Sequence, residues 1–104
     1  MNVVDLEEVQ YDLEQDGVQV REQLARRIWE KAGWATVAIS FRERDGSSGP
    51  GADGEWKPAK LALLRFRRLD GVWKKQASLT MSGADAAELG AALAEWFDAS
   101  VSAS

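Results

Sequence analysis

The chain is 104 residues long, the size of one domain, and its formal net charge is −4. It has no cysteine and no histidine, which excludes disulfides, thiol nucleophiles, Ser-His-Asp catalysis and zinc sites of the Cys/His type. It also lacks a Walker loop, a dinucleotide glycine fingerprint and a pair of acids in an apolar context. No apolar run approaches the roughly 20 residues of a membrane span, and the acidic start does not resemble a signal peptide. We therefore expect a non-catalytic, cytoplasmic protein without cofactor, metal or membrane contact.

Charge is segregated along the sequence. Residues 1–20 sum to −6, residues 21–75 to +6 and residues 76–104 to −4. The basic segment also holds four of the five tryptophans. Because cations bind phosphates and flat aromatic rings stack unpaired bases, this combination is typical of a site for single-stranded nucleic acid.

The acidic segment 1–17 fits two local structures. Val9 and Tyr11 alternate with polar residues, which favours a strand, but the same stretch also has helical spacing. Asp16-Gly17 is typical of a two-residue hairpin turn. We also expect the acids of this segment, residues 5–16, to compete for the basic face when nucleic acid is absent.

Residues 18–32 are compatible with a helix or a long strand, because their apolar residues fit both periods. We favour a strand, since Ala32-Gly33 would then turn into the next strand. That arrangement places Trp29 and Trp34 in one hairpin.

Residues 34–44 give the clearest strand pattern. Small and large apolar side chains alternate with polar, basic and aromatic ones, so one face is expected to be buried and the other solvated. The Gly-rich stretch that follows, residues 45–55, has the composition of a flexible loop.

Residues 58–69 predict a second long strand. Leu61 and Leu63 share one parity and Leu64 and Phe66 the other, which predicts either a β-bulge between them or a strand buried on both faces.

The last predicted strand covers residues 72–81, after the hairpin signal Asp70-Gly71. Strict alternation places Trp73, Leu79 and Met81 on one face, and we expect Trp73 to belong to the core.

A terminal helix is predicted over residues 83–98, with Ser82 as its N-cap. Its apolar stripe includes Leu89, Leu93 and Trp96, and we expect Trp96 to lie in the core or an interface. The chain 1–104 is thus predicted as a single α+β domain, an antiparallel sheet of four or five strands followed by a C-terminal amphipathic helix.

The polar sheet face is the candidate nucleic-acid surface. Each of its residues is individually explained by a solvated strand, but the charge segregation favours a shared site. Trp56, beside the Gly-rich stretch, is either a loop flank or a further stacking residue. The candidates are Trp34, Thr36, Arg42 and Arg44 from the first strand, Arg65 with Arg67 or Arg68 from the second, and Lys74 and Gln76 from the third. The parity of residues 60–69 leaves the directions of Arg65, Arg67 and Arg68 open.

Four successive patterns over residues 34–97 resemble a known family. They are a strand ending in charged residues (Val37–Glu43), a Gly-containing loop entering Gly54-Glu55-Trp56-Lys57-Pro58, a strand (Ala77–Met81) and a capped helix with Leu89, Leu93 and Trp96. The family is the single-stranded-DNA-binding coactivator family of positive cofactor four, in the superfamily that includes Whirly proteins. The extra strand at residues 60–69 and the absence of a Ser/Lys-rich N-terminal tail depart from the family pattern.

The resemblance implies a curved sheet of four strands and a helix, dimerised through helices and strand edges. It implies binding of single-stranded or melted DNA with little sequence preference. By position, Arg42, Arg44, Lys57 and Lys60 match the family's cations, and Trp56 matches an aromatic or apolar position.

The expected function is therefore non-catalytic binding of single-stranded DNA or RNA by a homodimer, in a transcription or DNA-maintenance role. The alternative is a protein-interaction module whose basic sheet or helix stripe docks an acidic or apolar partner.

Overall fold

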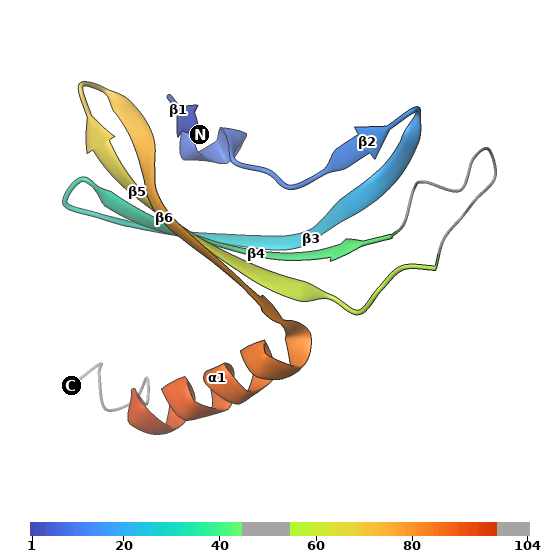
Figure 1. The fold of residues 1–104 in the computed structure, drawn as a ribbon. Coiled ribbons are helices and arrows are strands. Elements are labelled where there is room, and N and C mark those ends of the chain that lie inside the picture. The colour runs from blue at the N-terminus through green and yellow to red at the C-terminus, as the bar shows by residue number, and fades with distance from the viewer. Residues whose placement is uncertain (45–54, 98–104) are drawn as a thin grey trace.

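The computed structural model describes residues 1–44 and 55–97. It contains a curled, antiparallel six-stranded sheet followed by a helix, so the α+β class is confirmed, with six strands rather than four or five (Figure 1). The strand order is β1-β6-β5-β4-β3-β2. The elements are β1 (Asn2–Val3), the 3-10 helix η1 (Leu6–Glu8), β2 (Leu13–Gln15), β3 (Val18–Lys31), β4 (Trp34–Glu43), β5 (Lys60–Leu69), β6 (Val72–Ser82) and α1 (Gly83–Trp96).

Three two-residue turns join antiparallel neighbours as the sequence predicts: β2 to β3, β3 to β4 and β5 to β6. At each turn a residue with positive φ precedes a glycine with positive φ, the geometry that joins twisted antiparallel strands. Of the ambiguous residues 18–32, all but Ala32 form strand β3. The Ala32-Gly33 turn then leads into β4 and places Trp29 and Trp34 in one hairpin. The predicted flexible loop, apart from residue 55, lies outside the described residues.

The sheet has two faces with different surroundings. It curls toward the N-terminal segment, and α1 lies on the opposite side (Figure 1). The concave face holds the core, because the β4 side chains of Ala35, Val37, Ile39 and Phe41 are all buried there. The other side is called the convex face below.

The N-terminal strap, residues 1–12, covers the concave face. It joins opposite edges of the sheet, because β1 pairs with β6 and β2 pairs with β3. Leu6 and Val9 are buried in the core cluster. The first segment is therefore neither a single strand nor a single helix, since two short strands flank η1.

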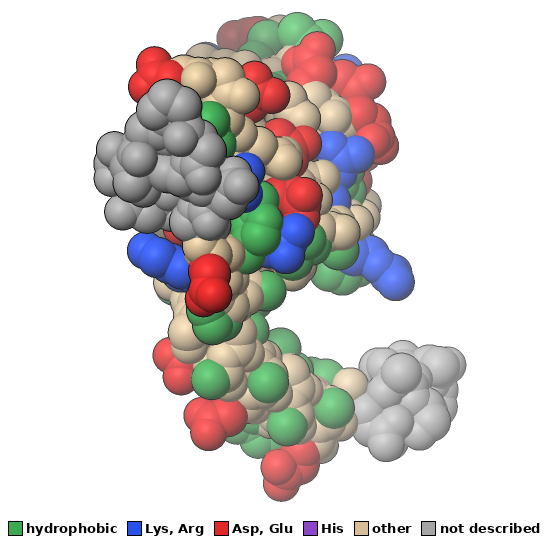
Figure 2. Space-filling view, turned by 90° about the vertical axis from the view of Figure 1, so that its right-hand side faces the viewer, with side chains coloured by type: hydrophobic (Ala, Val, Ile, Leu, Met, Phe, Trp, Pro, Cys, Tyr) green, Lys and Arg blue, Asp and Glu red, His purple; other side chains and the backbone are tan. Residues whose placement is uncertain are grey.

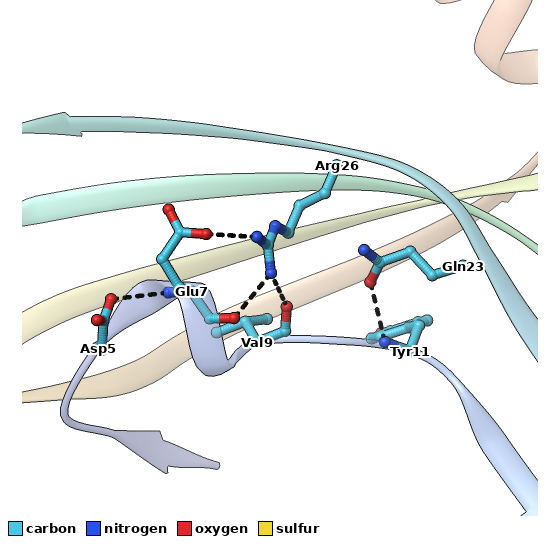
Figure 3. A network of polar contacts seen from close by, with 6 residues as sticks. All are labelled: Asp5, Glu7, Val9, Tyr11, Gln23 and Arg26. Atoms are coloured by element: carbon cyan, nitrogen blue, oxygen red, sulfur yellow. Dashed lines mark hydrogen bonds and ion pairs between the residues drawn. The ribbon is translucent and has the colours of Figure 1, made fainter.

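Arg26 holds the strap on the sheet (Figure 3). Its Nη1 donates to the backbone oxygens of Glu7 at 2.9 Å and Val9 at 2.8 Å, and its Nη2 pairs with the Glu7 carboxylate. Nearby, the Gln23 side chain accepts a hydrogen bond from the Tyr11 amide at 3.1 Å. These bonds satisfy strap groups that have no strand partner there.

A β-bulge interrupts the β5–β6 pairing at a place that the sequence does not predict. Arg65 pairs with Ala77 and Phe66 with Lys75, which leaves Gln76 as the extra residue. No register shift occurs at Leu63 or Leu64, where both faces of β5 are apolar.

The bulge corrects the predicted face of Trp73. Trp73 is core, with 4% of its surface exposed, but Leu79 on the same strand is 52% exposed. One inserted residue reverses the alternation, so the two side chains lie on opposite faces and the predicted shared face is wrong.

Helix α1 ends at Trp96 within the described residues, and Ser82 caps it as predicted by accepting a hydrogen bond from the Asp85 amide at 3.1 Å. No residue of the helix is buried. Trp96 is 66% exposed and is not part of the core.

The strap should carry a large part of the stability. We expect Leu6→Ala to lower the free energy of unfolding by about 2–5 kcal/mol, because it opens a cavity in the core. Val4→Ala, at a strap residue that is 71% exposed, should change it by less than about 0.5 kcal/mol. Urea unfolding of both variants measures this, and equal effects would show that the strap does not cover the core in solution.

Candidate nucleic-acid interface

Strand register brings basic and aromatic side chains together on the convex face. Trp34 pairs with Arg67 and Thr36 with Arg65 between β4 and β5, and Trp29 of β3 pairs with Thr36. Directly paired residues project from the same side of a sheet. Residues from three strands therefore meet at the end of the sheet near the β3–β4 turn.

The first cluster, the Trp34 stack, consists of Trp34 and two arginines that lie against its ring. The guanidinium carbons of Arg65 and Arg67 lie 4.9 and 5.2 Å from the centre of the Trp34 ring. Arg65 also donates to the Thr36 hydroxyl at 2.7 Å. Cation–π contact positions both guanidinium groups at the surface, and the hydrogen bond additionally fixes that of Arg65.

Trp29 lies beside this stack and is 55% exposed. Together with Trp34 and Lys31 it lines an open hollow of 690 Å³. An exposed indole at the rim of a hollow can stack on a flat ligand without prior rearrangement.

The second cluster, the Trp56 stack, lies at the other end of β4. The guanidinium carbons of Arg42 and Arg44 are each 4.4 Å from the Trp56 ring centre. Arg42 also pairs with Glu22 at 2.8 Å, and the Arg44 Nε donates to the backbone oxygen of Gln19 at 2.7 Å. These arginines are thus more heavily engaged than those of the Trp34 stack.

The backbone extends the β4–β5 pairing toward Trp56. The amide of Lys57 donates to the Glu43 oxygen at 2.8 Å, which holds the segment after the Gly-rich stretch against the end of β4. Eight residues separate Trp34 from Arg42, so the two stacks are about 26 Å apart along the strand at 3.3 Å per residue.

Positive charge on the convex face is largely uncompensated near the Trp34 stack. Among residues 1–44 and 55–97, no ion pair involves Lys31, Arg65 or Arg67. Register also places Arg27 and Lys74 on this face, opposite Ala38 and Arg67. Unpaired cations beside aromatic rings form an anion-attracting surface.

Two candidate residues, Lys60 and Arg68, lie on the other face of the sheet, and a third, Gln76, is the unpaired residue of the bulge. Lys60 pairs with buried Phe41 and contacts Glu43 on the concave side. Arg68 pairs with buried Trp73 on the same side, and the Gln76 side chain donates to the Lys74 oxygen at the bulge. Side chains alternate between the two faces along β5, and Lys60 and Arg68 occupy positions that face the concave side.

Three further residues, Arg27, Trp29 and Lys31, belong to the convex surface and are absent from the sequence-based candidates. They alternate along β3, a signal that is visible only if residues 18–32 are a strand.

The acidic strap does not cover the basic convex face. Leu6 and Val9 fix it to the core on the concave side, so the expected competition by residues 5–16 is wrong for the arrangement described.

Glu43 is the centre of a charge cluster at the concave rim. It contacts Arg21 and Lys60, each at 3.3 Å. Burial alone would raise the pKa of the Glu43 carboxyl, but the hydrogen bonds and charges of Lys60 and Arg21 outweigh it and lower the pKa. The Lys60 ammonium group is therefore paired with a carboxylate of the protein itself.

Comparison of the chain with protein-family models, curated proteins and solved structures found no match. Within the described ranges, no group of three or more histidine, cysteine, aspartate or glutamate side chains could hold a metal ion. In the same part of the chain, no helix has the length and apolar character needed to cross a membrane.

The lowered pKa of Glu43 predicts an acid-dependent contribution to stability. It is fully present above the ordinary glutamate pKa of about 4.3 and is lost as the pH falls through the lower pKa of the folded state. We expect Glu43→Gln to lower the melting temperature at neutral pH, with the difference from wild type shrinking in acid. A difference that stays constant throughout a pH series of thermal melts would contradict this assignment.

Proposed function

We propose that the chain binds single-stranded nucleic acid on its convex face, without catalysing a reaction. The observation that carries this proposal is the Trp34 stack with exposed Trp29 beside it. Guanidinium groups match phosphate geometry, and an exposed indole offers a face for an unpaired base. Both lie on the face that the strap leaves open.

The two kinds of group have separate tasks. Arg65 and Arg67 neutralise phosphates from positions already fixed by Trp34, so little side-chain freedom is lost on binding. Trp29, which is half exposed, stacks a base in the adjoining hollow. No contact in this scheme requires a particular base, which fits binding with little sequence preference.

The ligand follows β4 from the Trp34 stack toward the Trp56 stack. A separation of about 26 Å accommodates roughly eight nucleotides at the 3.4 Å spacing of a stacked strand. Arg42 and Arg44 supply cations at the far end, after exchange of part of their present hydrogen bonding.

The proposal covers DNA and RNA, and the resemblance of residues 34–97 to the positive cofactor four family favours DNA. The proposal also includes that the chain forms a homodimer in the cytoplasm and acts in transcription or DNA maintenance.

A protein-interaction module is the second candidate. The exposed Trp96 and Phe97 at the end of α1, 66% and 69% exposed, favour it, because large apolar side chains on an uncovered helix are typical of docking surfaces.

Fluorescence titration with a 20-nucleotide oligothymidylate tests the nucleic-acid proposal. We expect tryptophan quenching that weakens with salt, and Trp29→Ala should cost about 1–3 kcal/mol of binding free energy, a roughly 5- to 150-fold loss of affinity. Arg67→Gln should reduce the slope of log affinity against log salt by about 0.7.

Arg68→Gln is the matched control, since it removes the same charge one residue along β5 but on the concave side. It should leave affinity and slope close to wild type at physiological salt, where distant charges are screened. An equal effect of Arg67→Gln and Arg68→Gln, or the absence of quenching at low salt, would overturn the proposal.

A further inference from the structure

A second hollow lies on the concave face, beside the N-terminal strap. It has a volume of 330 Å³ and is lined by strap residues and by residues of β3, β5 and β6. It shares only Ile28 and Glu30, at the edge of the sheet, with the hollow beside Trp29 on the convex face. It is also separate from α1, which projects from the sheet body as an arm with hydrophobic side chains along it (Figure 2). This second hollow is called the strap hollow below.

The floor of the strap hollow is apolar. Leu6 and Trp73 are buried, and Ile28 packs against the same core cluster. Leu6 comes from the strap, Ile28 from β3 and Trp73 from β6, so both the strap and the sheet contribute to the floor. An apolar group that lies on this floor is shielded from water on one side by the existing core.

Two opposite charges of the strap hollow have no ion-pair partner. Glu30 pairs with buried Ala35 and Arg68 with buried Trp73, so both side chains project on the concave side. Among the residues that the structure describes, neither forms an ion pair. The register places their Cα atoms about 12 Å apart, because Arg68 lies two residues beyond Phe66 and two strands across from Glu30. A small molecule that carries both charges can bridge this distance.

The other two carboxylates of the strap hollow are already engaged. The Asp5 carboxylate accepts a hydrogen bond from the Glu7 amide at 2.9 Å, and the Glu7 carboxylate pairs with Arg26 (Figure 3). The groups left for a ligand are therefore one carboxylate, that of Glu30, and one guanidinium, that of Arg68. These two groups together favour a zwitterion over a simple cation or anion.

We propose that the strap hollow binds a free amino acid with a large apolar side chain. The ligand's carboxylate pairs with the Arg68 guanidinium, which suits bidentate hydrogen bonding, and its ammonium group pairs with the Glu30 carboxylate. Its side chain packs on the floor formed by Leu6, Ile28 and Trp73. The volume of the hollow lies at the lower end of the range for small-molecule sites, about 300–1,000 Å³, as expected for a ligand of this size.

A ligand in the strap hollow contacts the strap and the sheet at the same time. Leu6 belongs to the strap, whereas Glu30 and Arg68 belong to the sheet. A ligand that binds only the folded state stabilises that state by mass action. The amino acid therefore fastens the strap over the core, and the stability of the chain responds to the amino-acid concentration.

Calorimetric titration with L-phenylalanine tests the ligand class. We expect a dissociation constant of about 1 mM or lower, together with a higher melting temperature. N-acetyl-L-phenylalanine lacks the ammonium group and L-phenylalaninamide lacks the carboxylate, so each should bind at least about tenfold more weakly. Equal binding of the three compounds would overturn the proposal. So would the absence of both binding heat and a melting shift at about 10 mM phenylalanine.

Arg68→Gln and Glu30→Gln test the site itself. Each replaces an exposed charge, so the variants should stay folded, which circular dichroism verifies. Each should weaken phenylalanine binding by about 10- to 100-fold, because one charged hydrogen-bond partner is lost. Arg67→Gln is the matched control, since it removes the same charge one residue along β5 but on the convex face, and it should leave this affinity unchanged.

Equal effects of Arg67→Gln and Arg68→Gln on phenylalanine binding would refute the assignment. The two substitutions have the opposite roles in the oligothymidylate titration, where Arg68→Gln is the control. The amino-acid site and the nucleic-acid surface can therefore fail separately.

Discussion

Coverage of the concave face by the N-terminal strap is the interaction on which the rest of the structure depends. A single sheet is stable only if at least one face is removed from water. Here Leu6 and Val9 lie over the buried side chains of β4 and β5, and Arg26 fixes the strap backbone. Because this cover comes from the start of the chain, the C-terminal helix is not needed for it and is free to project from the other side.

The consequence is a convex face with two zones. Near the β3–β4 turn it is basic and aromatic, with the guanidinium groups of Arg65 and Arg67 against the Trp34 ring. Toward α1 it is apolar, with Leu63 opposite the exposed Leu79. A charged ligand suits the basic zone and an apolar partner suits the other, so the proposed nucleic-acid surface takes up only part of this face.

The fold was largely predictable from the sequence where a pattern of a few neighbouring residues determines the local structure. The alternation of β4, the three turn signals and the Ser82 cap each depend on a few neighbouring residues, and each is found in the structure. The bulge at Gln76 was not predictable, because the extra residue is ordinary in type and only the pairing with β5 reveals it. The same dependence on pairing decides that Arg65 and Arg67 face Trp34 while Arg68 does not.

Indole NMR signals provide the most direct test of the central claim, that the convex face binds single-stranded nucleic acid. Each tryptophan gives one ring N–H signal. On titration with oligothymidylate, the account predicts shifts for Trp29 and Trp34 on the convex face and little change for Trp73, which is buried beneath the strap. Shifts concentrated at Trp73 or in the strap amides, or no shift at all, would contradict it.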